Sequence, residues 1–116
     1  MRQAVALAYD DALAARVRDE LAGEEGLTER RMFGGLAFLV HGHMAVVVSG
    51  RDGLMLRCPP EETDTLLAEP GAGPMVMRGK ELRGWLRVEP DALDDDDALA
   101  RWVAVGRDHA RTLPPK

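Results

Sequence analysis

The chain has 116 residues, enough for one domain that buries a hydrophobic core without disulfides or metals. Its hydrophobic content of 46% excludes a disordered chain, and its net charge of −5 disfavours general binding to phosphate backbones, although a local basic face stays compatible with it. A single cysteine, the lack of a secretory leader and the lack of an apolar run of roughly 18 residues predict a cytoplasmic protein that enters no membrane.

The first predicted element is a helix over residues 10–22. Leu13, Val17 and Leu21 recur four residues apart, which places their side chains on one face of that helix. An aspartate directly before the apolar pattern can cap the amino end. We therefore expect this helix to pack on the rest of the domain through that face.

The segment ERRMFGGLAFLV, residues 29–40, predicts the first strand. Apolar residues occupy both of its alternating faces, so this strand is expected to be central or covered on both sides. Gly34 and Gly35 lie in the middle of the pattern, where we expect a bulge or the close approach of another element. A phosphate-binding loop is disfavoured, because its glycines would open a helix and end in Lys-Ser or Lys-Thr.

Two further strands are predicted over residues 44–49 and 54–58. The turn signals at 41–43 and 50–53 are short, so the three strands should form an antiparallel meander. A short helix is predicted over residues 59–71, with glutamates in its first turn, where a negative charge favours the helix dipole.

A second hairpin is predicted over residues 74–79 and 84–89, around the letters KELR, and a last helix over residues 91–113. The apolar stripe of that helix consists of Leu99, Trp102, Val103, Gly106, Ala110 and Leu113. The predicted fold class is α+β: a five-stranded antiparallel sheet in the order α-β-β-β-α-β-β-α, with helices packed on the sheet. Residues 1–116 are expected to form one domain with its core over about residues 8–113.

Side chains that carry catalytic or metal chemistry do not assemble into a recognisable pattern. His41, His43 and Cys58 are the only metal candidates, and a zinc site needs three or four converging ligands. The aspartates at 94–97 suit a helix start better than a calcium loop, which needs spaced oxygens and a glycine. No nucleophile has a base at a defensible spacing. We therefore expect no enzyme, no metal and no cofactor.

The fourth predicted strand offers a candidate partner face. Met75 and Met77 share one strand face, where methionine either fills a core or forms an adaptable contact surface. The basic residues of this region are Arg78, Lys80, Arg83 and Arg87. Trp85 shares a strand parity with Arg83 and Arg87, which suggests a base-stacking platform. Direct nucleic-acid binding is nevertheless disfavoured by the 4% aromatic content and the acidic total.

Three segments of the chain together resemble the amino-terminal domain of the TfoX/Sxy family. They are RRMFGGLAFLVHGHMAVVV, GPMVMRGKELRGWLRVEP and DDDDALARWVAVGRDHARTLPP. The residues that carry the resemblance are Met32, Phe33, Gly34, Gly35, Gly84, Trp85 and the Leu-Pro-Pro at 113–115. The resemblance covers roughly residues 8–115.

The resemblance implies an α+β domain with an antiparallel sheet and a link to the regulation of natural competence. The namesake proteins help to activate transcription of DNA-uptake genes and carry a second, carboxy-terminal domain. This chain is expected to be the stand-alone amino-terminal domain, so functions of the second domain are not transferred to it. The resemblance supplies no catalytic residues.

Two functional hypotheses follow. The first is a non-enzymatic protein-interaction module, accessory to transcriptional regulation. It would contact a protein partner, or a second copy of itself, through a sheet edge or the Met75/Met77 face. The alternative is a small-ligand or metal-binding protein with a pocket between the sheet and the last helix.

Overall fold

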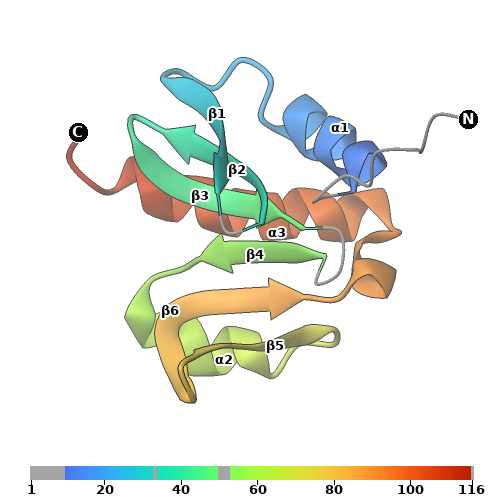
Figure 1. Ribbon diagram of the computed structural model, residues 1–116, viewed down its shortest axis with the longest axis vertical. Helices are drawn as coiled ribbons and strands as arrows, with labels where there is room; N and C mark the ends of the chain where they lie inside the picture. Colours follow the sequence, from blue (N-terminus) through green and yellow to red (C-terminus); the bar gives the residue numbers. More distant parts are fainter. Residues whose placement is uncertain (1–9, 33, 50–52, 116) are drawn as a thin grey trace, which may run out of the picture.

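The computed structural model describes residues 10–32, 34–49 and 53–115. Within these residues, helices pack against a six-stranded sheet in the order β1-β2-β3-β4-β6-β5, and every neighbouring pair is antiparallel (Figure 1). The elements are α1 Asp11–Glu20, β1 Leu27–Met32, β2 Gly35–Val40, β3 His43–Val48, β4 Leu54–Arg57, η1 Pro60–Glu62, α2 Thr63–Leu67, β5 Ala72–Met77, β6 Lys80–Val88, η2 Pro90–Leu93 and α3 Asp96–Arg111. The predicted α+β class is confirmed, whereas the predicted five strands are wrong.

The missing strand comes from residues 29–40, which form two strands and not one. β1 and β2 pair as a hairpin in which Met32 lies opposite Gly35. β2 is buried along its whole length, whereas β1 is an edge strand whose charged residues are exposed. Gly34 belongs to the turn, with a φ of 71°. The chain therefore reverses at the glycines, where a bulge within one strand was predicted. The strand before the turn was not predicted, because an edge strand does not need an apolar pattern.

The second hairpin turns earlier than predicted. Its turn is Arg78-Gly79, both with positive φ, and β6 begins at Lys80. Two successive residues of positive φ are what a two-residue hairpin needs to match strand twist. The order is thus α-β-β-β-β-α-β-β-α, with β5 at the edge because β4 pairs with β6. The predicted turn at residues 50–53 lies largely outside the described residues.

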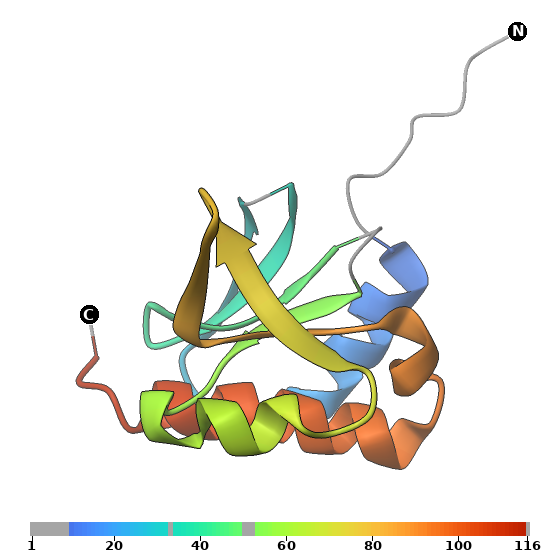
Figure 2. The same cartoon turned by 90° about the horizontal axis from the view of Figure 1, so that it is seen from below.

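The helices cover one face of the sheet (Figure 2). A buried cluster joins that face to α1 and α3, and its largest fully buried side chains include Trp102 and Phe38. The predicted stripe of the last helix is confirmed for Leu99, Trp102, Val103, Gly106 and Ala110, which are all buried, whereas Leu113 lies beyond the end of the helix and is half-buried. The helix itself begins at Asp96, because the Asp95 carboxylate accepts a hydrogen bond from the Ala98 N–H and caps it.

An ion pair fastens the end of α3 to the segment after α1. Arg111 donates to both carboxylate oxygens of Glu24, with Nε 2.8 Å from Oε2. This hydrogen bonding lowers the pKa of Glu24. A carboxylate whose pKa is lowered by folding adds stability above its unfolded pKa and loses it as the pH falls through the folded value.

We therefore expect Glu24→Gln to lower the melting temperature at pH 7. The difference from the native chain should shrink below pH 4.5, the usual glutamate value, and vanish below the lowered pKa. Melting curves followed by circular dichroism from pH 7 to pH 2.5 would measure it. Glu20→Gln, at an exposed position, is the control and should change little at any pH. A constant difference across that range would contradict the assignment.

Candidate functional site

The edge strand β5 carries the large apolar side chains that are most exposed among the described residues. Val76 is 54% exposed and Met77 42% exposed, and both lie on the edge strand β5. Met75 is buried and belongs to a cluster inside the domain. The two methionines that the sequence placed on one face thus differ in role, because Met75 fills a core and Met77 reaches solvent.

The basic residues near this edge fall into two groups. Arg78 and Lys80 are exposed and form no ion pair within the described part of the chain. Arg83 donates to the Pro60 carbonyl and lies 3.4 Å from Asp64, and Arg87 donates to the Pro74 carbonyl. Both side chains thus bond to the domain itself, although Arg87 lies on the same side of the sheet as Trp85, as predicted.

Gly84 and Trp85 lie at a bend in β6. Pairing with β5 shifts register between Pro74 and Val76, so one residue of β5 faces several of β6 there. Gly84 accepts from the Cys58 N–H and donates to Thr63 Oγ1, which ties the bend to the start of α2. The guanidinium of Arg57 lies 5.7 Å from the centroid of the Trp85 ring, a cation–π contact. Gly84 and Trp85, which carry part of the family resemblance, thus lie at the bend of β6 and connect it to neighbouring elements.

The face of the sheet away from the helices carries a second cluster built from strands alone. Ala37, Leu39, Val47, Met55 and Met75 form its buried part, and Met32, Met44, Leu82 and Trp85 pack against them, half-buried. We call the side formed by Met32, Met44, Met55, Met75, Leu82 and Trp85 the methionine face. The hairpins β1–β2 and β5–β6 rise on this side, opposite the helices (Figure 2).

The three metal candidates have separate surroundings. His41 is in a turn, 3.8 Å from Glu25, and His43 donates to the Pro114 carbonyl. Cys58 is buried beside Thr63, and burial raises the pKa of its thiol, so it is protonated at neutral pH. Among the described residues no group of three or more His, Cys, Asp or Glu is placed to hold a metal ion.

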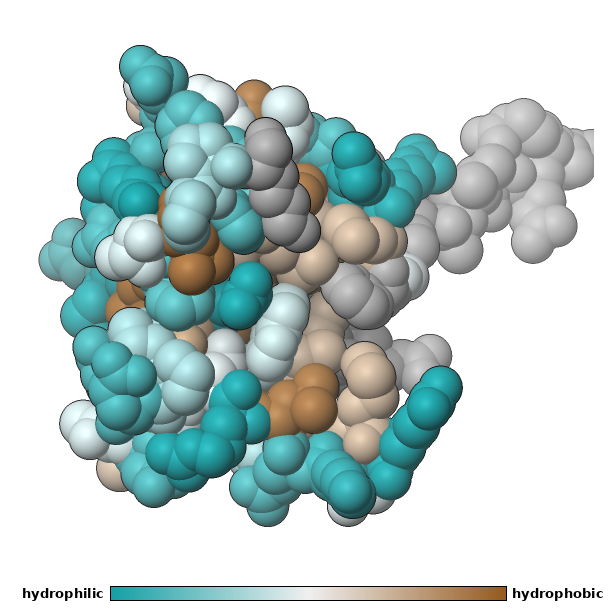
Figure 3. All heavy atoms as spheres, turned by 90° about the vertical axis from the view of Figure 1, so that its left-hand side faces the viewer, coloured by the Kyte–Doolittle hydropathy of each residue, from teal (hydrophilic) through white to brown (hydrophobic). Residues whose placement is uncertain are grey.

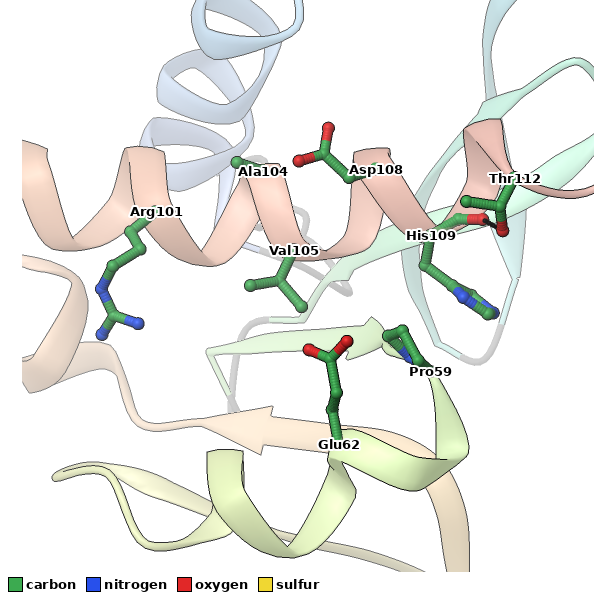
Figure 4. A pocket seen from close by; sticks show the side chains of 8 residues that line it. All are labelled: Pro59, Glu62, Arg101, Ala104, Val105, Asp108, His109 and Thr112. Atoms are coloured by element: carbon green, nitrogen blue, oxygen red, sulfur yellow. Dashed lines mark hydrogen bonds between the residues drawn. The ribbon is translucent and has the colours of Figure 1, made fainter.

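A cleft of about 460 Å³ separates α3 from the segment η1–α2. Figure 4 shows Arg101, Val105 and His109 pointing from α3 toward that segment, with Pro59 and Glu62 facing them. The apolar surface of the cleft comes from small side chains. Arg101, which also lines the cleft, is ion-paired with Glu69. Burial, assisted by the charge of Arg57, lowers the pKa of His109, so the imidazole is neutral at pH 7. This cleft differs from the predicted ligand pocket, which was placed between the sheet and the last helix, because the cleft lies between α3 and the segment η1–α2.

A family model described as the TfoX N-terminal domain matches residues 19–110. The chain belongs to this family. The match runs from the end of α1 to the last turn of α3, so this TfoX N-terminal domain includes every described strand of the sheet. No curated protein and no solved structure matches the chain. Within the described residues no helix is long and apolar enough to cross a membrane.

Sequence reasoning named Met75, Trp85 and Lys80 but missed the other members of the methionine face of the TfoX N-terminal domain and the cations Arg30 and Arg57. Met32, Met44, Met55 and Met75 lie on four different strands, so no single segment of the sequence shows that they gather. Arg57 is absent from the predicted partner face although it stacks on a predicted residue, Trp85. A strand-by-strand alternation count would have found the methionines, but only with the correct number of strands.

Proposed function

We propose that this TfoX N-terminal domain is a non-enzymatic protein-interaction module, accessory to transcriptional regulation. Its family is linked to the regulation of competence in general, and a regulator that lacks catalytic chemistry acts by binding. The proposal names a protein partner, or a second copy of the chain, as the binding target. The support is the family membership together with the surface of the sheet.

The observation that carries the proposal is the apolar end of the edge strand β5. Natural edge strands usually carry charges or other devices that prevent pairing with a second chain. β1 follows this rule, since Glu29, Arg30 and Arg31 are exposed along it. β5 instead presents Val76 and Met77 to solvent. A proline and a register shift protect the middle of β5, whereas the exposed apolar side chains at its end suit the addition of a partner strand.

Replacing these two side chains tests the proposal. Val76→Ser combined with Met77→Ser should weaken the retention of a specific protein from a cytosolic extract by about tenfold or more, because apolar anchors dominate binding energy. Ala12→Ser with Ala15→Ser, at exposed positions of α1, is the matched control and should retain it. Sedimentation would show whether the bound species is a second copy. Recovery of no partner together with a monomeric mass would overturn the proposal.

A further inference from the structure

The chain is acidic overall, but its charges are not evenly distributed. The arginines of the helices are neutralised locally: Arg16 pairs with Asp96, Arg18 with Glu29, Arg101 with Glu69, Arg107 with Asp108, and Arg111 with Glu24. Arg30, Arg31, Arg78 and Lys80, on or between strands, form no ion pair within the described part of the chain. The cations left to attract a partner therefore lie on the sheet and its hairpins.

The strand registers place most of these cations around the methionine face. Arg30 lies opposite Ala37, a member of that cluster, and residues directly opposite in an antiparallel pair share a face. Lys80 lies opposite Met77, two residues from Met75 on β5, so it points to the same side. Arg31, in contrast, lies opposite Leu36, which faces the helices.

A third cation lies within the methionine face itself. Arg57 follows Met55 by two residues on β4, lies opposite Trp85, and stacks on its ring. Its Nε is buried and has no hydrogen-bond partner among the residues that the structure describes. Figure 3 shows the side of the molecule that carries the bend of β6, where brown and tan side chains lie between hydrophilic ones. The strand registers thus give an apolar floor with Arg57 within it and with Arg30 and Lys80 on the two hairpins beside it.

We propose that the methionine face binds a peptide segment of a partner protein that carries both acidic and apolar side chains. This inference rests on the proposed function and names the chemistry of its partner. Methionine side chains adapt to different apolar groups, which suits a floor that receives leucine- or phenylalanine-like residues. Arg30, Arg57 and Lys80 are complementary to carboxylates on the same peptide.

A nucleic acid fits this surface less well than an acidic peptide. Trp85 is the one aromatic side chain in the described cluster, so successive bases lack stacking partners. The thioether floor offers apolar contact, whereas a phosphate backbone needs a continuous row of cations. The acidic residues of α1 and α3 also repel a long polyanion that extends past the face.

The test is a titration with a fluorescein-labelled peptide in which leucine alternates with glutamate, followed by fluorescence anisotropy. The native chain should bind it, and peptides with lysine for glutamate, or with serine for leucine, should bind about tenfold more weakly or worse. Labelling the methionine methyl groups with carbon-13 gives a second readout. The signals of Met32 and Met44 should shift on binding, because their side chains are half-buried on the proposed floor.

Two neighbouring residues of β1 supply a matched pair of variants. Arg30→Glu should weaken binding of the glutamate–leucine peptide by about tenfold, because it places a like charge on the rim. Arg31→Glu makes the same change in net charge on the opposite face of the same exposed strand, and should alter binding less than about twofold. Equal effects of the two variants would overturn the proposal, since the face would not matter.

The remaining outcomes separate this proposal from the proposed function. Tighter binding of a DNA duplex than of the peptide, or equal binding of the lysine peptide, would overturn the acidic partner. If a partner is retained through Val76 and Met77 but no acidic peptide binds, the proposal is wrong and the proposed function stands. If no partner is retained and the chain is monomeric, the proposed function falls, whatever the peptide does.

Discussion

Gly35→Val should destabilise the domain by about 3 kcal/mol or more, among the largest effects expected from one substitution. A Cβ on Gly35 would clash with the Val48 carbonyl oxygen and lie 3.2 Å from a methyl carbon of Val47. The obstacle is backbone of the neighbouring strand β3, so it cannot rotate away. Chemical denaturation followed by circular dichroism would measure the loss, and an unchanged midpoint would contradict the close approach.

Gly34 is the matched control, because its backbone conformation favours glycine, whereas at Gly35 the neighbouring strand leaves no space for a side chain. A Cβ there would meet nothing within 4 Å, but its φ of 71° lies in the left-handed region. Gly34→Ala should therefore cost only about 1 kcal/mol, and Gly34→Asn less, since asparagine tolerates that conformation. Two adjacent glycines should thus differ in their response to the same methyl group. If Gly34→Ala cost as much as Gly35→Ala, the hairpin geometry would be wrong.

The sequence predicted α1, α3 and the buried strands well because each has a strong apolar period. The helix predicted over residues 59–71 was too long, since the structure has only η1 and the five-residue α2 there. The stripe that includes Trp102 and Val103 is one example, and the fully buried β2 is another. β1 escaped prediction because its position at the edge leaves its side chains in water, so charged residues serve there as well as apolar ones. Local pattern could not distinguish a strand with central glycines from a hairpin with a glycine in its turn.

The candidate site was less predictable than the fold because it depends on register. Arg87 keeps the side of Trp85, because it lies opposite Met55, and it donates to the Pro74 carbonyl. The bend at Gly84 and the contact with Pro60 direct Arg83 elsewhere. Arg57 and Arg30 join the methionine face only through strand pairing. The sequence contains the residues of the methionine face, but the pairing and register of the strands determine which of them lie together.

Gly106→Val is the second substitution expected to have a large effect, about 3 kcal/mol or more. Gly106 is buried on α3 where the helix crosses β3. A Cβ there would lie 2.9 Å from a methyl carbon of Val46 and closer still to the Ala45 carbonyl oxygen. β3 pairs irregularly with β2 at this point, because Leu39 lies opposite Met44 and Phe38 opposite Val46, which leaves Ala45 as an extra residue. The bulged backbone leaves α3 no room for a side chain.

A smaller substitution at Gly106 distinguishes the close contact with β3 from helix propensity, because the two effects change the free energy of unfolding in opposite directions. Gly106→Ala in an open helix would add about 1 kcal/mol of stability, whereas here it should destabilise. Ala104→Val, on the cleft side of the same helix, should cost only about 0.5 kcal/mol, the difference in propensity. Urea titrations of the three variants would compare them. A stabilising Gly106→Ala would mean that α3 can withdraw from β3, and the helix would then not be fixed closely to the sheet beneath the methionine face.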